Sequence, residues 1–381
     1  MAAFELATAG RVVFGAGKLA EAPAALAGAR RALVVSGRSR ARAERLEAAL
    51  RDANVEAVAF AVHGEPTLDA AREGVRAAAG CDAVVAIGGG SAIDAGKAIA
   101  ALAANGGDPL DYLEVIGRGR ALERPSLPFV AIPTTAGTGS EVTRNAVLAD
   151  PASRVKASLR SPHMLPRVAI VDPELLDGAP REVIASSGLD ALAQLIEPFV
   201  CARRNPITDA LAREGIPRSM RALRRAADGA LDAPAREDLA LASLLGGLCL
   251  ANAGLGAIHG FAAPIGGTFD APHGAVCAAL LPIAVEVNVR AARARGGAAL
   301  ADRFDELARL VTGEPSARAE DAAAPLAALV RSLGVPGLSR WGMTDADVDP
   351  ICEKARAASS MKANPIALET EELRAIARRA L

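Results

Sequence analysis

Two histidines lie close together in a segment rich in glycine and proline. His259 ends an apolar run, and His273 stands within the tetrapeptide Ala-Pro-His-Gly. Gly266 and Gly267 lie between them and could reverse the chain, which would bring the two imidazoles together. A pair of imidazoles can bind a transition metal, whereas a single buried histidine is more often structural. The two histidines alone leave both roles open.

An acid and an amide precede these histidines on an expected helix. Asp190 and Gln194 are four residues apart in the sequence GLDALAQ, so on a helix they share one face. A carboxylate is a good metal ligand, but an acid near the start of a helix is also stabilised by the helix dipole. Asp190 is therefore a candidate ligand, with a purely helical role as the alternative.

A glycine-rich loop joins an apolar run to a helical segment farther upstream. Residues 88–91 have the sequence GGGS and follow the run 83–87. Glycines let a backbone adopt positive φ and approach a ligand closely, and the free N–H groups at a helix start attract an anion such as a pyrophosphate. The alternative is a tight turn in which Ser91 and Asp94 form a capping box. The motif is not the G-x-G-x-x-G pattern of common dinucleotide-binding folds.

A second polar loop, residues 133–143, follows another apolar run. It carries five hydroxyl groups and two glycines. Ligands of parallel α/β sheets bind at the carboxyl ends of the strands. This position favours a binding loop over an ordinary threonine-rich turn.

The predicted secondary structure changes near residue 173, from alternating strands and helices to helices alone. Before it, predicted strands at 32–36, 55–62, 83–87, 129–132 and 168–171 alternate with helices at 40–53, 68–79 and 92–104, and a hairpin is expected at 145–149 and 155–159. Beyond Pro180, helical segments follow at 182–203, 207–227, 236–256, 274–293, 300–311, 319–333, 344–358 and 370–380. This pattern predicts an α/β domain with a parallel sheet over 1–177 and an all-α domain over 178–381. The GGGS loop makes dinucleotide binding, as in a Rossmann-like domain, the expected role of the first domain.

Composition limits the partners. The formal net charge is −1, and no basic surface is expected for nucleic acid or for a membrane. The most apolar stretch, 241–258, contains Asn252 and several glycines, which favours a buried core helix over a membrane span. The N-terminal residues lack a secretory pattern, and the five scattered cysteines indicate free thiols. We expect a cytoplasmic protein that acts on a small molecule and contacts no nucleic acid and no membrane.

Several longer motifs occur in one order along the chain: GGGSAID, PTTAGTGSEVT, VDPELL, GLDALAQLIE, HGFAAPIGG and APHGAVCAALLP. Together they resemble the iron-containing (type III) alcohol dehydrogenase family, which includes glycerol dehydrogenase and maleylacetate reductase. The resemblance spans almost the whole chain. It implies an NAD(P)-binding domain, a helical metal-binding domain of the dehydroquinate synthase-like fold, and a homodimer or larger homo-oligomer.

The resemblance also implies roles for single residues. Asp190, His259 and His273 correspond to catalytic ligands of Fe²⁺ or Zn²⁺, with Gln194 as a fourth ligand or a neighbouring group. The residues expected around the NAD(P) cofactor are Gly37, Gly88, Gly89, Gly90, Ser91, Ala92, Asp94, Thr134, Thr135, Thr138, Val147 and Lys156.

Three positions depart from the commonest family pattern. Gln194 replaces a histidine ligand, and because an amide oxygen is a weaker donor than imidazole, we expect looser metal binding. Ala263 replaces a histidine that many relatives carry and that could relay protons. Gly37 replaces an aspartate with which NAD-specific relatives bind the adenosine ribose, and Arg38 and Arg40 follow it. We therefore expect NADP(H) to be accepted.

The reaction implied by the resemblance is hydride transfer between nicotinamide C4 and an alcohol or carbonyl held at the metal. Maleylacetate reductase is the nearest alternative, although that subgroup tends to read PTTYAGSE where this chain reads PTTAGTGSE. A dehydroquinate synthase-like lyase would need basic residues near the two histidines, and a two-histidine, one-carboxylate oxygenase would not need the GGGS loop. A relative that binds the cofactor but is inactive is the remaining alternative.

Overall fold

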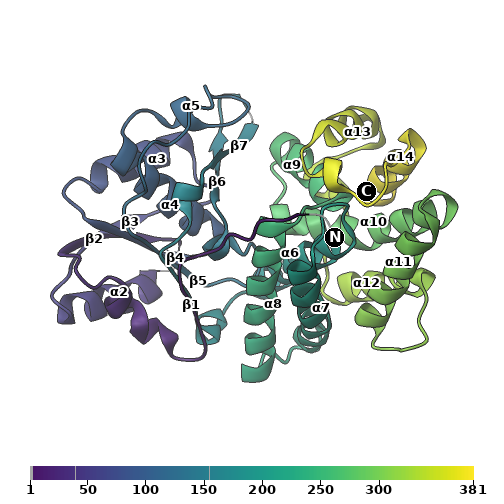
Figure 1. The fold of residues 1–381 in the computed structure, drawn as a ribbon, viewed down its shortest axis with the longest axis horizontal. Coiled ribbons are helices and arrows are strands. Elements are labelled where there is room, and N and C mark those ends of the chain that lie inside the picture. The colour runs from purple at the N-terminus through teal and green to yellow at the C-terminus, as the bar shows by residue number, and fades with distance from the viewer. Residues whose placement is uncertain (1–2, 39, 154) are drawn as a thin grey trace. The chain divides into compact units, whose positions relative to one another are not determined.

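A computed structural model describes residues 3–38, 40–153 and 155–381. The chain divides into two compact units, one formed by Ala7–Asp177 and the other by Gly178–Leu381 together with residues 3–6. In the described residues, the strands belong to the first unit and the second unit is helical (Figure 1).

A parallel sheet forms the first unit. In the described part of the chain it has six strands in the order β1-β8-β5-β4-β2-β3. The strands are β1 Val12–Phe14, β2 Arg31–Ser36, β3 Glu56–Ala61, β4 Ala83–Gly88, β5 Phe129–Pro133 and β8 Val168–Val171. A separate antiparallel hairpin pairs β6 Asn145–Asp150 with β7 Val155–Arg160. The predicted parallel α/β domain is confirmed, with β1 as an additional short strand.

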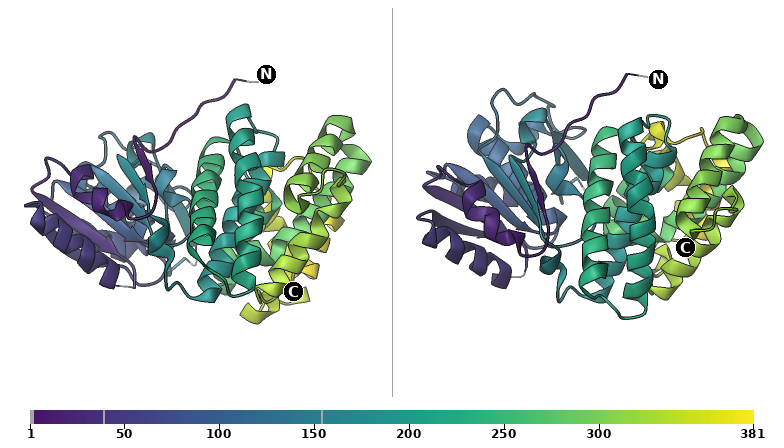
Figure 2. Two further views of the ribbon diagram at one scale, coloured as in Figure 1. Left: turned by 90° about the horizontal axis from the view of Figure 1, so that it is seen from below. Right: turned by 60° about the horizontal axis from the view of Figure 1, so that its bottom comes forward.

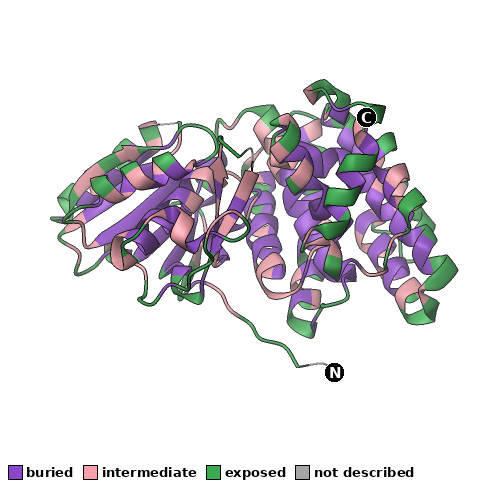
Figure 3. Cartoon of the chain, turned by 90° about the horizontal axis from the view of Figure 1, so that it is seen from above, coloured by how far each residue is buried: buried purple, intermediate pink, exposed green. Residues whose placement is uncertain are grey.

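Helices cover both faces of this sheet. They are α1 Ala22–Ala25, α2 Arg40–Asp52, α3 Leu68–Ala77, α4 Gly90–Asn105 and α5 Pro109–Tyr112. Successive strand residues point to opposite faces. Val34 and Val85 therefore pack with Leu46 of α2, whereas Val35 packs on the other face with Ile99 of α4. Figure 3 shows the strands as buried segments between more exposed helices. Burial on both faces explains why the strands are continuous apolar runs.

The strand order reverses between β2 and β4, which are neighbours in the sheet. From β2 the chain proceeds outward to β3, and from β4 it proceeds the other way to β5. Such a reversal leaves a crevice at the carboxyl ends of the two strands, where ligands of α/β proteins bind. The loop 88–91 follows β4, and Gly37 follows β2, so both lie at this edge.

The second unit contains α6 Arg181–Val200, α7 Pro206–Ala227, α8 Ala233–Asn252, α9 Ala257–Phe269, α10 His273–Arg295, α11 Gly297–Thr312, α12 Ala323–Ser332, α13 Val348–Ala357 and α14 Thr370–Arg379. Helices α6, α7 and α8 pack side by side, as both views of Figure 2 show. The predicted all-helical character is confirmed.

One predicted helix is in fact two. The apolar stretch 241–258 was expected to form a single core helix, but α8 ends at Asn252 and α9 begins at Ala257, with a bend of 95° between them. Gly266 and Gly267 lie inside α9 and do not reverse the chain. The reversal follows at Asp270, whose φ is 51°.

Among the helices of the described residues, α6 and α10 are long and apolar enough to cross a membrane by length and composition, and the bent pair α8–α9 would qualify if it were one span. In the most apolar window of α6 and of α10, 78% and 83% of the residues are buried inside the protein. Packing accounts for their apolar character.

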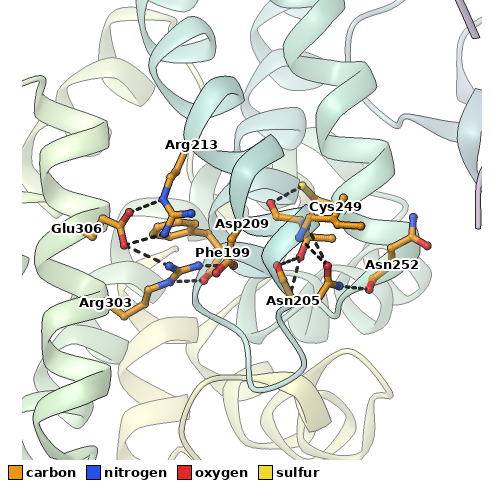
Figure 4. Close-up of polar contacts among 10 residues, drawn as sticks. Phe199, Asn205, Asp209, Arg213, Cys249, Asn252, Arg303 and Glu306 are labelled. Carbon is orange, nitrogen blue, oxygen red and sulfur yellow. Dashed lines mark hydrogen bonds and ion pairs between the residues drawn. The ribbon is translucent and has the colours of Figure 1, made fainter. Parts of the chain in front are cut away.

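A buried arginine joins three of these helices (Figure 4). The Arg303 guanidinium of α11 lies 3.4 Å from the centroid of the Phe199 ring of α6 and donates a hydrogen bond to the Phe199 carbonyl at 2.8 Å. It also forms ion pairs with Asp209 of α7 and, at 3.2 Å, with Glu306. Asn205 caps the start of α7 nearby. Removing one partner of such a buried pair typically costs about 3–5 kcal/mol, so this contact helps to hold the unit together.

Candidate metal centre and cofactor loops

Four potential metal ligands from three helices lie together in the second unit. Asp190 comes from α6, His259 from α9, and His273 and Cys277 from α10, and their ligand atoms all lie within 4.8 Å of one another. Asp190 Oδ1 is 3.4 Å from His259 Nε2 and 3.6 Å from His273 Nε2. Cys277 Sγ is 3.6 Å from the same His273 nitrogen. The structure thus brings the three predicted ligands together and adds a fourth candidate.

Close packing of α10 against α6 makes this arrangement possible. A Cβ atom on Gly274 would lie 2.5 Å from the carbonyl oxygen of Ser186 on α6, so a side chain at Gly274 would push the start of α10 away. His273 is the first residue of α10, and Cys277 follows one turn later on the same face. The two side chains therefore approach Asp190 together.

Buried polar atoms without partners point to an ion. Among the described residues, Asp190 Oδ1, Gln194 Oε1 and His259 Nε2 are buried and accept or donate no hydrogen bond. An unsatisfied buried polar atom typically costs about 1–3 kcal/mol, and a bound ion would remove that cost. A carboxylate, two imidazoles and a thiol form a donor set suited to Zn²⁺ or Fe²⁺. The residues therefore fit the divalent metal that the sequence led us to expect.

Two further side chains of α6 orient these donors. His259 Nδ1 donates a hydrogen bond to Glu197 Oε2 at 2.7 Å, and Glu197 Oε1 accepts one from the backbone N–H of Ile258 at 2.6 Å. Because a carboxylate only accepts, Nδ1 carries a proton, and Nε2 is the ring nitrogen that is directed at Asp190. Gln194 Nε2 donates to Asp190 Oδ2 at 2.9 Å, which leaves Oδ1 directed at the cluster.

The charges in the cluster favour a cation. Burial alone would raise the pKa of Asp190, but the His273 and His259 imidazoles hold that pKa below its usual range. Burial likewise acts to lower the pKa of His259, yet Cys277 and Asp190 raise it well above its ordinary value. Cys277 also raises the pKa of His273. The acidic groups thus draw positive charge into the site, which a divalent ion would supply.

One side of the cluster is open to solvent. The His273 side chain is 42% exposed, whereas those of Asp190 and His259 are 2% and 6% exposed. A small molecule could reach the donor atoms from the His273 side.

Ala263, one turn after His259, is exposed and carries no group that could transfer a proton.

The two polar loops of the first unit pack against each other. The N–H of Thr134 donates to the carbonyl of Gly88 at 2.9 Å. A Cβ atom on Gly90 would lie 2.6 Å from Thr138 Cγ2, and one on Gly89 would lie 3.4 Å from Thr135 Cγ2. Residues 88–90 do not have positive φ. The expectation that these glycines adopt positive φ is therefore wrong. Gly90 is required by the close approach of Thr138, and Gly88 by Ala92, whose Cβ lies 2.6 Å from the position of a Cβ on Gly88.

The predicted Ser91–Asp94 capping box is also wrong. Helix α4 begins at Gly90 with Gly89 as its N-cap and has no side-chain cap. Asp94 instead accepts hydrogen bonds from the Ser140 hydroxyl and, at 3.0 Å, from the backbone N–H of Val147. Asp94 thus joins α4 to the loop 133–143 and to the hairpin.

Lys97 also joins α4 to the loop 133–143, and the sequence analysis did not identify this residue. Its buried ammonium pairs with Asp94 at 3.1 Å and donates to the Ser140 carbonyl at 2.9 Å and to the Thr143 hydroxyl at 3.0 Å. The spacing Asp94-x-x-Lys97 on one helix face is the signal that could have revealed it. Lys97 therefore fixes the end of the second loop.

With this geometry established, comparison with known proteins identifies the family. The family model "Iron-containing alcohol dehydrogenase" matches residues 9–173, and "Fe-containing alcohol dehydrogenase family, C-terminal" matches residues 184–381. The chain belongs to the iron-containing alcohol dehydrogenase family. The resemblance found in the sequence motifs is confirmed, and with it the general activity of a metal-dependent, nicotinamide-linked alcohol dehydrogenase.

Individual relatives match over most of their length. The chain is 36% identical to 1,3-propanediol dehydrogenase of Klebsiella pneumoniae over 87% of this chain and 85% of the relative. It is 33% identical to an NAD-dependent methanol dehydrogenase of Bacillus methanolicus over 93% of each. A solved structure of a 1,3-propanediol oxidoreductase superposes over 100% of both chains with a TM-score of 0.91 and 32% identity.

Other predicted cofactor residues of this alcohol dehydrogenase lie as follows. Ala92 is buried in the first turn of α4, and Ser91 beside it is half-buried. The backbone nitrogen of Gly37 lies 3.2 Å from the position of a Cβ atom on Gly88, which places the ends of β2 and β4 together. Lys156 lies on β7, where its Nζ is 3.5 Å from Glu65.

The two arginines after Gly37 differ in their surroundings. Arg38 is exposed. Arg40 Nη2 donates to both carboxylate oxygens of Glu47, at 3.0 and 3.3 Å. Arg38 is therefore the freer of the two to meet a ligand.

Cys277 and Glu197 are the metal-centre residues that sequence reasoning missed. Cys277 follows His273 by four residues, so the sequence alone could have placed it on the same helix face as that predicted ligand. Glu197 lies on the same helix as Asp190. The contact between Glu197 and His259 joins two helices far apart in the sequence, so only the fold reveals it.

Proposed function

We propose that the chain interconverts small alcohols with aldehydes or ketones, using NAD(P) and a divalent metal held by Asp190, His259 and His273. The observation that carries this proposal is the convergence of buried, unpartnered donor atoms on one point, in a chain that also has the two packed loops after β4 and β5. Both features are what a metal-assisted hydride transfer needs.

The metal would be Zn²⁺ or Fe²⁺, and when bound it supplies the Lewis acidity that lowers the pKa of an alcohol or polarises a carbonyl. The protein residues prepare the donors. Glu197 keeps the His259 proton on Nδ1, and Gln194 turns Oδ1 of Asp190 inward. His273 forms the solvent-facing edge at which a small substrate would enter.

The cofactor would be held by the loops of the first unit. The backbone N–H groups at the start of α4 face the crevice at the carboxyl ends of β2 and β4, and a helix start attracts a pyrophosphate. Asp94 and Lys97 hold the second loop against the first. When bound, the nicotinamide would supply or accept a hydride at C4. Ala263 offers no group for proton transfer, so the hydroxyl proton would have to move through water, a cofactor hydroxyl or another group.

We also propose that NADP(H) is accepted. Gly37 stands at the end of β2, and a Cβ atom there would meet nothing within 4 Å. An acid at this position would repel a 2′-phosphate, and the glycine removes that repulsion. The exposed Arg38 next to it is a candidate partner for the phosphate.

A screen of NADH and NADPH oxidation with short aldehydes, ketones and maleylacetate tests this function. We expect turnover of at least one short aldehyde or ketone and weaker turnover of maleylacetate. Preferred turnover of maleylacetate would favour a maleylacetate reductase. No turnover of any carbonyl compound by the metal-loaded protein, despite cofactor binding, would identify an inactive relative and overturn the proposal.

A further inference from the structure

We propose that Cys277 is a fourth protein ligand of the metal centre, bound through its thiolate sulfur. The inference rests on the proposed metal site at Asp190, His259 and His273 and assigns it one more donor. Cys277 is fully buried, and its Sγ belongs to the same group of ligand atoms as the three predicted donors.

Three of the donor separations are those expected between ligands of one ion. Because zinc in a catalytic site can expand to five ligands, four protein donors still leave a position for the substrate oxygen. Nitrogen, oxygen and sulfur ligands at about 2.0–2.3 Å from one tetrahedral centre lie roughly 3.3–3.6 Å from each other. The separations of Asp190 Oδ1 from the two histidine nitrogens are 3.4 and 3.6 Å, and that of Cys277 Sγ from His273 Nε2 is 3.6 Å. Cys277 Sγ therefore already lies at a ligand-to-ligand distance from His273 Nε2, within a group whose atoms all lie within 4.8 Å of one another.

Independent observations show that this position faces a ligand. Asp190 Oδ1 and His259 Nε2 are both more than nine-tenths buried and have no hydrogen-bond partner. Both atoms belong to the group that contains Cys277 Sγ. Each of these atoms is costly without a cation, and a cation bound by them would lie beside the Cys277 sulfur.

Gln194 is the competing candidate for the fourth position, and its contacts favour a different role. Its amide oxygen forms no hydrogen bond, but its amide nitrogen already holds Asp190 Oδ2 at 2.9 Å. An amide oxygen is also a weak donor for zinc, whereas a thiolate is among the strongest. Gln194 is therefore a positioning residue for Asp190, and Cys277 is the ligand.

The assignment changes the expected metal affinity and selectivity. Binding replaces the S–H bond of Cys277 by a metal–sulfur bond and releases the proton to solvent. The added negative charge offsets the weak donor at Gln194, and the soft sulfur favours Zn²⁺ over harder ions such as Mn²⁺ or Mg²⁺. The looser binding expected from Gln194 alone is therefore not what this site should show.

X-ray absorption at the zinc edge of the full-length protein tests the assignment without any mutation. After chelation and reloading with Zn²⁺, we expect one sulfur neighbour at about 2.3 Å beside nitrogen and oxygen neighbours at about 2.0–2.2 Å. Stoichiometric zinc surrounded by nitrogen and oxygen alone would overturn the role of Cys277 and leave the proposed function intact. Failure to bind zinc, iron or cobalt at all would overturn both.

Variants loaded with Co²⁺ identify which cysteine supplies the sulfur. We expect the wild-type protein to show a thiolate-to-cobalt charge-transfer band in the near ultraviolet, and Cys277→Ser to lose it while it still binds cobalt at least about tenfold more weakly. Cys249→Ser is the matched control, because Cys249 is also buried but its thiol bonds to the Thr208 carbonyl on α7. A band that survives in Cys277→Ser, or that disappears in Cys249→Ser, would contradict the proposal.

Discussion

His259 Nδ1 lies 2.7 Å from Glu197 Oε2, and the other nitrogen of the same ring lies 3.4 Å from Asp190 Oδ1. The imidazole is thus held between a carboxylate that receives its proton and a second carboxylate on the side where a metal would bind. This order of groups raises the basicity of a metal-binding histidine and fixes its orientation. Glu197 is therefore placed to act on a bound metal through His259.

Glu197→Gln should weaken metal binding by about 10–100-fold, because a neutral amide is a poorer acceptor for the His259 proton. Competition with a chromophoric chelator at fixed pH measures the affinity. Glu182→Gln, an exposed glutamate on the same helix, is the control and should leave the affinity unchanged. An unchanged affinity in Glu197→Gln would show that Glu197 does not support the metal centre.

Gly37→Asp should shift the cofactor preference toward NADH. The new carboxylate fits in open space at the end of β2, where it would bond a ribose hydroxyl and repel a 2′-phosphate. We expect the ratio of kcat/KM for NADPH to that for NADH to fall about tenfold or more, which corresponds to about 1.4 kcal/mol. Gly37→Ala adds a Cβ without charge and should leave the ratio unchanged. An equal effect of both variants would indicate a steric cause instead.

Gly90→Ala should weaken cofactor binding and leave the metal content unchanged. The added Cβ would lie 2.6 Å from Thr138 Cγ2, so the two loops would have to separate. We expect the Kd for NADH, measured by fluorescence, to rise about tenfold or more, because the loop N–H groups would be displaced. Adding Thr138→Ala removes the closest atoms and should recover part of the loss. Normal NADH binding in Gly90→Ala would exclude this loop from the cofactor site.

Glu141 should make stability depend on pH. Burial raises the pKa of this carboxyl from an ordinary value of 4.5 to about 7, although Lys97 acts to lower it. The folded state therefore holds the proton to higher pH than the unfolded chain, and the free energy of unfolding should fall as pH rises from about 4.5 to 7. Glu141→Gln cannot ionise, so its stability relative to wild type should grow by up to about 3 kcal/mol across this range.

Urea unfolding at pH 5 and pH 8 measures that difference. Glu73→Gln on α3 alters an exposed glutamate and should show the same pH dependence as wild type. A constant difference between Glu141→Gln and wild type at the two pH values would mean that Glu141 ionises as freely in the folded state as in the unfolded chain.

The sequence predicted most of the fold because its signals are local. Buried strands such as β4 are uninterrupted apolar runs, and the helices of the second unit are long and rich in alanine and leucine. The local sequence signals failed for those elements whose secondary structure depends on contacts with distant parts of the chain. Strand β1 has only three residues and exists because it pairs with β8, and α9 contains Pro264 and three glycines that would not predict a helix on their own.

In the candidate site, too, local patterns predicted some residues, and contacts between distant parts of the chain determined the others. The histidines and Asp190 are conspicuous by residue type and spacing, and the glycine loop is conspicuous by composition. Ser91 fits an N-cap pattern by sequence, yet the N-cap of α4 is Gly89, two residues earlier, and Asp94 bonds to a distant segment. The contacts of Glu197 with His259 and of Lys97 with Ser140 span long sequence separations. Helical spacing could have revealed that Lys97 pairs with Asp94, but it could not reveal these two distant contacts.

The dependence of carbonyl reduction on bound metal tests the central claim most directly. NAD(P)H oxidation should be measured with an accepted aldehyde, alongside metal content, in untreated, chelated and reloaded protein. We predict that activity disappears with chelation, returns in proportion to bound Zn²⁺ or Fe²⁺ up to about one ion per chain, and stays absent in His259→Ala although that variant still binds NADH. Full activity in metal-free protein, or in His259→Ala, would contradict the account.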